Sequence, residues 1–403
     1  MLDELAAVAP FRHEVREWAA AHVPPDWRAR QRGAGHHELV SFLRWWAGEL
    51  RSAGWLVPHW PREWGGGLSV VEQVVLAEEL ARGDAPGNAL YQVALYNAAP
   101  AIIHAGTDAQ RRRYLPGMLA GEVWCQGFSE PNAGSDLAGL QTRAVRDGDH
   151  YIVTGQKVWT SMAMEADWCI LLARTDPDAP RHKGISCLIV DMRAAGIEVR
   201  PIRQATGAAE FCETFLDEVV VPVEDRVGDE NEGWQVAQGT LASERAVVIL
   251  EMAERLRRNG VEAMIAETAT WALETGEVAA DDATVRDSLA ARYAEAVVLR
   301  HLVNGMISDV IHGVDVGATS SVIKVFYSEL LQGLMRTGSD LQGLRAQIDQ
   351  PLLMAAGWET GSWMMDYINS WGWTVGGGTS EIMRNIIGER ALGLPREPRA
   401  GMS

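Results

Sequence analysis

A single carboxylate, Glu244, stands on what the spacing predicts to be the apolar face of a helix. It follows Leu241 by three residues and precedes Val248 by four, and side chains at those intervals share one helical face. A carboxylate on such a face is costly to bury unless it has a partner or a task. A structural ion pair with an arginine elsewhere is one interpretation. We favour a catalytic base, because desolvated carboxylates concentrate at functional sites.

A second stretch suited to chemistry runs from Trp124 to Gly139. Its first half is apolar and is typical of a strand that is buried on both faces. Its second half is built of Pro, Asn, Gly, Ser and Asp, so the chain must turn sharply there. Glycines let backbone N–H groups approach a ligand, Ser135 adds a hydroxyl, and such a loop can cradle a phosphate. Taken alone, the stretch also fits an ordinary loop after a strand.

The order of residues in this stretch resembles the first signature of the acyl-CoA dehydrogenases, which are flavoproteins. Two further segments resemble the same family in the family's order, GQKVWTS at 155–161 and GGGTSEIMR at 376–384. The three matches extend over nearly the whole chain, which is identified as a member of the family. The resemblance implies FAD-dependent α,β-dehydrogenation of an acyl-CoA thioester, with electrons passed to an electron-transfer flavoprotein.

Desaturation of a thioester requires a base for the α-proton and hydrogen-bond donors for the carbonyl oxygen, on which charge develops. Many family members carry the base at the position occupied here by Gly377, which has no side chain. Members of the isovaleryl and long-chain types carry it instead in a Glu-Arg pair on a helix after the β domain. Glu244 and Arg245 match that pair. The resemblance therefore implies that Glu244 is the base and that Gly377 offers its N–H to the thioester oxygen.

The resemblance also implies which residues of the first loop hold FAD. Phe128 and Ser129 would border the isoalloxazine ring through backbone groups. Gly134 and Ser135 would lie near the pyrophosphate.

The second and third segments would complete the flavin site. Trp159 would stack by the flavin, and Ser161 would hydrogen-bond its edge, although a core aromatic is an equal alternative for Trp159. Thr379 and Glu381 would meet the adenine side of a flavin, in a neighbouring subunit.

One segment of the family is missing. No Arg-x-x-Phe-Gly, which grips the pyrophosphate across a dimer, follows the polar break at 276–282, and the chain reads VRDSLAARY at 285–293. Arg286 and Arg292 are both candidates to replace it. The pattern resembles actinobacterial members that act on sterol side chains or other bulky acyl-CoAs, several of which pair two different chains. We therefore expect a branched or bulky substrate and a dimer of dimers, homo- or hetero-oligomeric.

Three blocks must position these residues: helices over 1–120, strands over 121–228 and helices over 229–403. In the first block, apolar residues at 11, 15 and 18 recur at helical spacing, and Ser69 is a plausible N-cap. Short apolar runs separated by turn residues are typical of a β-barrel or sandwich; they begin at Val123, Tyr151, Trp168, Ser186 and Phe215. In the third block, apolar residues return to helical spacing, and the resemblance implies a C-terminal four-helix bundle.

The composition excludes several classes of function. A net charge of −18 argues against nucleic acid or an anionic membrane as a partner. The four cysteines share no CxxC spacing and are expected to be buried, in a reducing compartment. No signal peptide opens the chain and no apolar run is long enough to span a bilayer. These features predict a soluble cytoplasmic protein without a metal site.

Two other functions fit the same motifs. One is a flavin monooxygenase on the same fold, which would hydroxylate an amine or oxidise a nitroalkane. The other is a non-catalytic subunit that completes the flavin site of another chain. Glu244 favours dehydrogenation over both, because a silent subunit needs no carboxylate at that place.

Overall fold

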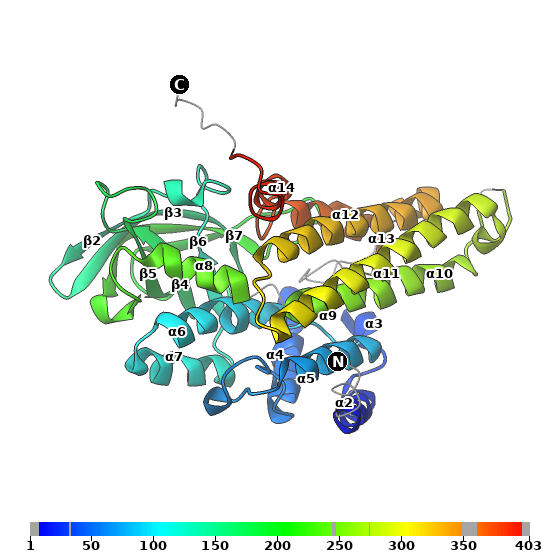
Figure 1. Cartoon of the computed structure of the whole chain (residues 1–403), viewed down its shortest axis with the longest axis horizontal. Helices are drawn as coiled ribbons and strands as arrows, with labels where there is room; N and C mark the ends of the chain where they lie inside the picture. Colours follow the sequence, from blue (N-terminus) through cyan, green and yellow to red (C-terminus); the bar gives the residue numbers. More distant parts are fainter. Residues whose placement is uncertain (1–7, 32–33, 244–246, 274, 349–360, 397–403) are drawn as a thin grey trace.

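The structure is a computed structural model that describes residues 8–31, 34–243, 247–273, 275–348 and 361–396. Along this part of the chain, helices are followed by strands and then by helices again. Figure 1 shows the sheet at one end of the molecule, with a long helical bundle that extends away from it. The predicted α+β class, with a β block between two helical blocks, is therefore confirmed.

The N-terminal helices begin and end where local signals predict. Ser69 accepts a hydrogen bond from the N–H of Glu72 at 3.2 Å, and the Glu72 carboxylate accepts one from the N–H of Ser69 at 2.7 Å. This reciprocal capping box confirms the predicted N-cap. Val15 is fully buried, with Phe11 and Trp18 packed against it. The helices are α2 (Ala9–His22), α3 (Trp27–Gln31), α4 (His36–Ser52), α5 (Val70–Arg82), α6 (Ala99–Ala105) and α7 (Asp108–Ala120), with a π-helical turn at Val93–Ala98.

The middle block forms an eight-stranded mixed sheet in the order β6-β7-β3-β2-β4-β5-β8, with β1 beside β4. Strands β2 and β4 are paired at one position only, Arg143 with Arg174. Buried residues from both sides of this junction, including Tyr151 and Leu188, share one core. The sheet is thus folded on itself, as a barrel or sandwich is. Its strands are β1 (Trp124–Gly127), β2 (Arg143–Asp147), β3 (His150–Ser161), β4 (Trp168–Arg174), β5 (Ile185–Asp191), β6 (Ile197–Pro201), β7 (Phe211–Pro222) and β8 (Arg226–Val227).

The five predicted strands are present, but β2, β6 and β8 were not predicted from their residues. Both β2 and β6 carry charged side chains and are largely exposed, so they lack the apolar run that signals a strand. The strand predicted at 151–155 also continues to Ser161 as β3, because its polar second half pairs with β7.

The C-terminal block is a helical bundle built around two long antiparallel helices, α11 (Ala283–Ile311) and α12 (Gly317–Gln342). Asp282 caps α11 through the N–H groups of Thr284 and Val285, which places the start of this helix directly after the predicted polar break. Figure 1 places α14 at the end of the bundle nearest the sheet. The remaining helices are α8 (Gly233–Ser243), α9 (Val247–Arg255), α10 (Ala263–Thr268), α13 (Trp363–Ser370) and α14 (Ser380–Ile386), with π-helical turns at Leu256–Glu262 and Ile387–Ala391.

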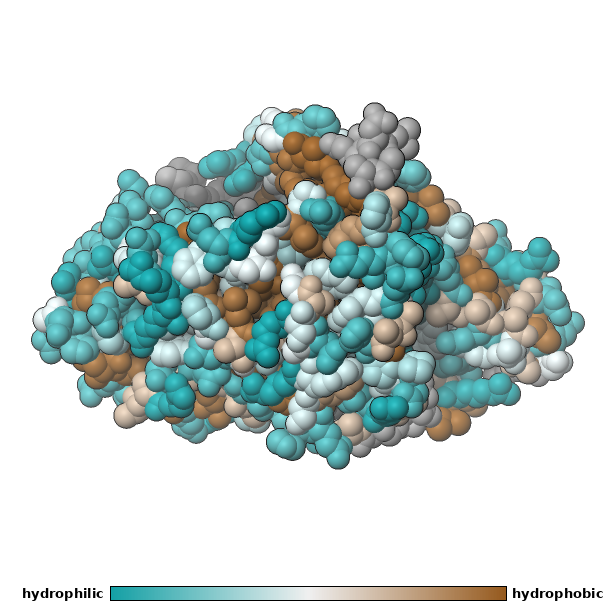
Figure 2. All heavy atoms as spheres, turned by 90° about the horizontal axis from the view of Figure 1, so that it is seen from below, coloured by the Kyte–Doolittle hydropathy of each residue, from teal (hydrophilic) through white to brown (hydrophobic). Residues whose placement is uncertain are grey.

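The surface and the cysteines bear on the predicted class of protein. All four cysteines are buried and free, as predicted. Figure 2, which views the molecule from below, shows mainly hydrophilic residues with a larger hydrophobic area near the top of that view. Within the described ranges, no helix combines the length and the apolar character that crossing a membrane requires.

Candidate functional site

The loop after β1 is anchored by one buried carboxylate, Glu130. Its two oxygens accept hydrogen bonds from the N–H groups of Gln141, at 2.7 Å, and Thr142, at 2.8 Å. The backbone of Glu130 also pairs with Ala133 in both directions, which closes a tight turn. These contacts join the two ends of the predicted phosphate-binding loop.

The partner of Glu130 is Lys157 of β3, which is fully buried. Its ammonium group donates to the Glu130 carboxylate at 2.8 Å and to the carbonyl of Phe128 at 3.1 Å. Burial lowers the pKa of Lys157, and the charge of Glu130 opposes that change. Burial pushes the pKa of Glu130 up, but Lys157 and the backbone donors outweigh it, so the pKa is lowered. The ionised pair is therefore the stable form at neutral pH.

Phe128 and Ser129 are held rigidly by these contacts. The Phe128 carbonyl accepts from Lys157, and the Ser129 carbonyl accepts from the N–H of Val158 at 3.0 Å. Because both carbonyls are used within the protein, a ligand contact at these residues falls to their N–H groups or to the Ser129 hydroxyl. The predicted flavin-bordering residues thus lie directly against the second predicted segment, 155–161.

Trp159 lies on a bulge in β3. Between Lys157 and Thr160 the strand carries one more residue than β7 does, and Trp159 adopts a left-handed conformation with φ of 61°. Its indole is 57% exposed and meets the edge of Phe211, with ring centroids 6.2 Å apart. Such a conformation is strained for a bulky residue and is a device that re-aims a side chain. The core interpretation of Trp159 is therefore wrong, and its free aromatic face fits a flat ring such as a flavin.

Gly134 and Ser135 lie at the surface, beyond the turn that Glu130 closes. No atom lies within 4 Å of where a side chain on Gly134 would begin, so this part of the loop is open to a ligand. The following residues are fixed by Arg174, which donates to the carbonyl of Ala138 at 2.8 Å, and by an ion pair between Asp136 and Arg181. An open, backbone-lined loop on a fixed base fits a phosphate group.

The third predicted segment forms a glycine turn before α14. Gly377 and Gly378 both have positive φ, 66° and 97°, and Thr379 caps the helix through the N–H of Ile382 at 3.2 Å. Glu381 is exposed, and the N–H groups and hydroxyl at the cap lower its pKa. The ammonium of Lys324, on α12, donates to the carbonyl of Gly378 at 2.6 Å.

Lys324 was not singled out from the sequence, although a signal exists. The chain has three lysines, Lys157, Lys183 and Lys324, among 36 basic residues. Two of the three hold the carbonyl of a residue in a predicted site segment. In a chain with only three lysines, each lysine is a candidate for a specific structural role.

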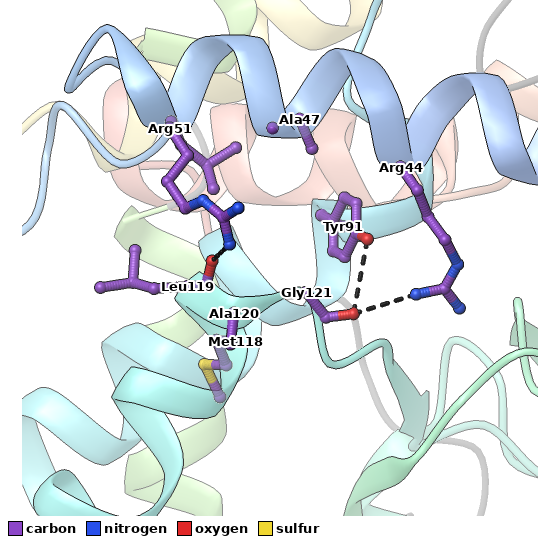
Figure 3. Close-up of a pocket in the computed structure, with 10 residues that line it drawn as sticks. Arg44, Ala47, Arg51, Tyr91, Met118, Leu119, Ala120 and Gly121 are labelled. Carbon is purple, nitrogen blue, oxygen red and sulfur yellow. Dashed lines mark hydrogen bonds between the residues drawn. The ribbon is translucent and has the colours of Figure 1, made fainter.

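A surface cavity in the described part of the chain lies away from these residues. It has a volume of about 140 Å³ and is lined by α4 and the end of α7. Figure 3 shows that Arg44 and Arg51 point to the carbonyls of Gly121 and Leu119, at 3.1 and 3.0 Å. Cations at a helix C-terminus stabilise it, so these arginines complete the end of α7. None of the predicted site residues lines this cavity.

Three family models match the chain in succession. They are the acyl-CoA dehydrogenase N-terminal domain over residues 8–122, the middle domain over 125–219 and the C-terminal domain over 231–392. The chain belongs to the acyl-CoA dehydrogenase family. It is accordingly an oxidoreductase of a flavoprotein family. The division of the chain after residues 120 and 228 stays a prediction.

Similar proteins support the same assignment over the full length of this acyl-CoA dehydrogenase. Acyl-CoA dehydrogenase IpdE1 of Mycolicibacterium smegmatis is 37% identical over 97% of this chain and 98% of its own. Acyl-CoA dehydrogenase FadE34 of Mycobacterium tuberculosis is 41% identical over 86% of this chain and 46% of its own.

Two solved structures have the same fold. The Tcur3481-Tcur3483 steroid ACAD has a TM-score of 0.84 and 33% identity, covering 97% of this chain and 98% of that one. The ChsE4-ChsE5 complex from Mycobacterium tuberculosis has a TM-score of 0.81 and 34% identity, covering 98% of both.

The predicted base of this acyl-CoA dehydrogenase, Glu244, lies outside the described residues. Among the described residues, His59 donates from Nε2 to the carbonyl of Leu95 at 3.1 Å, and Tyr96 stacks on His59 with ring centroids 4.6 Å apart. Burial lowers the pKa of His59 to about 4. Burial, and after it the charge of Glu251, raises the pKa of Tyr96. Both rings are therefore neutral at pH 7.

The two candidate arginines of α11 differ in their surroundings. Arg292 pairs with Glu295 at 2.8 Å and packs against Gly333 of α12. Arg286 is exposed, and within the described ranges its guanidinium forms no ion pair. Of the two, Arg286 has the more exposed side chain.

Proposed function

We propose that this acyl-CoA dehydrogenase binds FAD non-covalently and desaturates a branched or bulky acyl-CoA thioester. One observation carries the cofactor part of this proposal: the exposed indole of Trp159, on a strained bulge beside the clamped loop at Phe128 and Ser129. A protein that leaves a tryptophan in this conformation forgoes its burial, which stacking on a flat ligand would restore.

Different residues of this chain contact different parts of FAD. Trp159 stacks on the flavin, Ser161 hydrogen-bonds its edge, and Phe128 and Ser129 border the ring through their N–H groups. Gly134 and Ser135 lie along the pyrophosphate. The chemistry that FAD supplies when bound is acceptance of a hydride from the β-carbon.

The adenine side belongs to the third segment. Thr379 and Glu381 meet the adenine side of a neighbouring subunit's flavin, and Arg286 approaches the pyrophosphate across the interface. The exposure of Glu381 and Arg286 supports this placement, because both side chains lie at the surface of this chain.

Two residues of this chain act on the thioester. Glu244 takes the proton from the α-carbon, and its spacing from Leu241 and Val248 in the sequence supports this role. The N–H of Gly377 donates to the thioester oxygen and stabilises the charge that develops there. Its carbon carries no side chain, so this position offers a donor and no competing base.

The relatives support a proposal for the substrate and the assembly. The similar solved structures include a steroid ACAD and a complex of two chains. We therefore propose a bulky, ring-bearing acyl group and a dimer of dimers that contains either identical or two different chains. Electrons pass from the reduced flavin to an electron-transfer flavoprotein.

The absorbance spectrum of the assembled protein tests the function. The purified holoprotein is mixed without oxygen with butyryl-CoA, isovaleryl-CoA, palmitoyl-CoA and the CoA thioester of a steroid carboxylic acid. The proposal expects flavin absorbance that is lost fastest with the steroid thioester and without any nicotinamide cofactor. A protein that takes up no FAD, or whose flavin needs a reduced nicotinamide, would contradict it, and the second result would favour a monooxygenase.

A further inference from the structure

Lys324 is a half-buried cation whose position in the fold gives it one clear task. It lies on α12 beside the fully buried Ile323, and its ammonium nitrogen is 2.6 Å from the carbonyl oxygen of Gly378. Burial lowers the pKa of Lys324 to about 8, and the negative charge of Glu381 acts against that change. Burying a charged lysine costs free energy, so a role other than solubility is expected for Lys324.

The turn that Lys324 holds has unusual conformational freedom. Gly377 and Gly378 follow each other with φ of 66° and 97°. Residues without a side chain lose the most freedom when a turn is ordered, so such a turn needs external contacts to keep one shape. The φ of Gly378 is one that residues with a side chain rarely adopt, so glycine cannot be exchanged there for a stiffer residue.

Each side of the turn has its own contact, and Lys324 supplies the contact in between. The N–H of Gly376 donates to the carbonyl of Gly372 at 2.8 Å on one side, and the Thr379 hydroxyl caps α14 on the other. Between them, the hydrogen bond from Lys324 orients the peptide between Gly378 and Thr379. The peptide between Gly376 and Gly377, which carries the Gly377 N–H, comes two peptides earlier. The two are joined through Gly377 and Gly378, so fixing the later peptide limits the orientations of the earlier one.

The scarcity of lysine points the same way. Of the three lysines, Lys183 is exposed, whereas Lys157 and Lys324 each donate to a backbone carbonyl of a site segment. A lysine brings a compact charge to a single point at the end of a narrow stem, whereas an arginine requires room for a planar fork. The single carbonyl of Gly378 is an acceptor of the kind that the lysine ammonium suits.

We propose that Lys324 is a positioning residue for the reaction, which holds the carbonyl of Gly378 so that the N–H of Gly377 faces the thioester oxygen. This inference rests on the proposed function, in which that N–H donates to the thioester. In this role Lys324 acts on the thioester only through the turn. Its effect is therefore confined to ligands that carry a carbonyl oxygen at that place.

The test compares two ligands on three proteins. The wild type, K324M and the control K183M, which removes the exposed lysine, are assembled with FAD. The panel thioester that reduces the wild-type flavin fastest is one ligand. Its thioether analogue, in which a methylene replaces the carbonyl, is the other, because it fills the same pocket without an oxygen to hold.

The expected result separates positioning from a structural role. K324M should reduce its flavin with the thioester about tenfold to a hundredfold more slowly, less than or near the loss caused by removing an oxyanion donor outright. It should keep its flavin content, and it should bind the thioether as tightly as the wild type does. K183M should match the wild type in every measurement.

Several outcomes overturn the proposal. A wild-type rate of flavin reduction in K324M would show that the turn keeps its shape without the hydrogen bond from Lys324. Weakened binding of the thioether, to the same degree as the loss of rate with the thioester, would show a general structural defect. A second variant, K324C, is measured before and after aminoethylation, which rebuilds an amine of nearly lysine length; failure of the rebuilt amine to restore the rate also counts against it. If no thioester reduces the wild-type flavin, the proposed function fails, a result distinct from these.

Discussion

The ammonium nitrogen of Lys157 lies 2.8 Å from a carboxylate oxygen of Glu130 and 3.1 Å from the carbonyl oxygen of Phe128. This buried arrangement joins β3 to the loop after β1, so the two segments that are proposed to hold the flavin move as one body. We expect K157M to lose stability by about 3–5 kcal/mol, because it leaves the Glu130 charge buried without its partner. Chemical denaturation measures that loss.

A double-mutant cycle with E130Q isolates the pair. Removing both charges should cost less than the two single changes together, since neither remaining group is then an unpaired buried charge. Additive losses would show that the two residues act independently. FAD affinity should fall in both single variants, because the loop at Phe128 and Ser129 is released.

The strained bulge at Trp159 predicts a separation of stability from cofactor binding. In W159G, relief of the left-handed conformation, about 1–2 kcal/mol, offsets the roughly 1 kcal/mol by which glycine's freedom favours the unfolded chain. The thermal midpoint should therefore change little, while FAD affinity falls about tenfold with the loss of a stacking surface. Calorimetry and flavin fluorescence measure the two effects.

A matched control exists for this variant. Glu218 also has positive φ, 53°, and is exposed, but it lies outside the proposed flavin contacts. E218G should leave FAD affinity unchanged. Undiminished FAD affinity in W159G would remove Trp159 from the cofactor site.

The proposed base predicts a large and specific loss of rate. Glu244→Gln keeps size and hydrogen bonding but removes basicity, so flavin reduction by the best acyl-CoA should slow by about a hundredfold or more. The protein should fold, retain FAD and bind the thioester. Glu381→Gln should instead weaken flavin retention and leave the reduction step of the bound flavin unchanged.

Rapid-mixing absorbance without oxygen measures both variants. A wild-type rate of flavin reduction in Glu244→Gln would refute the assignment. The silent-subunit and monooxygenase hypotheses would then come first.

Glu79 predicts how the N-terminal helices respond to acid. Its carboxylate is buried and bonded to Arg12 and Arg16, at 2.7 and 2.9 Å. Burial alone would raise the pKa of Glu79, but the bonds to these arginines outweigh it, and the pKa is lowered from the ordinary 4.5. A carboxylate with a lowered folded pKa stabilises the protein above its unfolded pKa, and this contribution is lost as pH falls through the folded pKa.

The unfolding free energy should therefore decline below about pH 4.5, the value of an unperturbed glutamate. In Glu79→Gln the decline should be shallower, and the protein should be less stable at pH 7. Denaturation curves at a series of pH values give the comparison. Parallel curves for the two proteins would show that Glu79 titrates alike in the folded and unfolded chains.

Exposed apolar residues of the C-terminal block predict an assembly. Trp371, Val375, Leu392 and Leu394 are each more than half exposed, and apolar groups near one another on a surface mark interaction sites. We expect a complex larger than a monomer by light scattering, and dissociation together with flavin loss in L392D/L394D. A monomer that holds FAD tightly would contradict this expectation.

Local signals in the sequence were sufficient for much of the secondary structure. Ser69 begins α5, Asp282 caps α11, and the apolar runs at Trp168 and Ser186 form β4 and β5. Capping and periodicity act over a few residues, so they can be recognised without knowledge of the fold. The motif segments likewise indicated the family and the loops that carry its chemistry.

The tertiary structure decided how those loops are held. Lys157 meets Glu130 across 27 positions of the chain, and Lys324 meets Gly378 across 54; such contacts have no local period. The exposure of Trp159 depends on a bulge that forms only when β3 pairs with β7. Strand β6 has no apolar run of its own and exists because β7 offers it an edge. Pairing between distant segments is fixed by the packing of the whole chain, so local sequence patterns do not predict it.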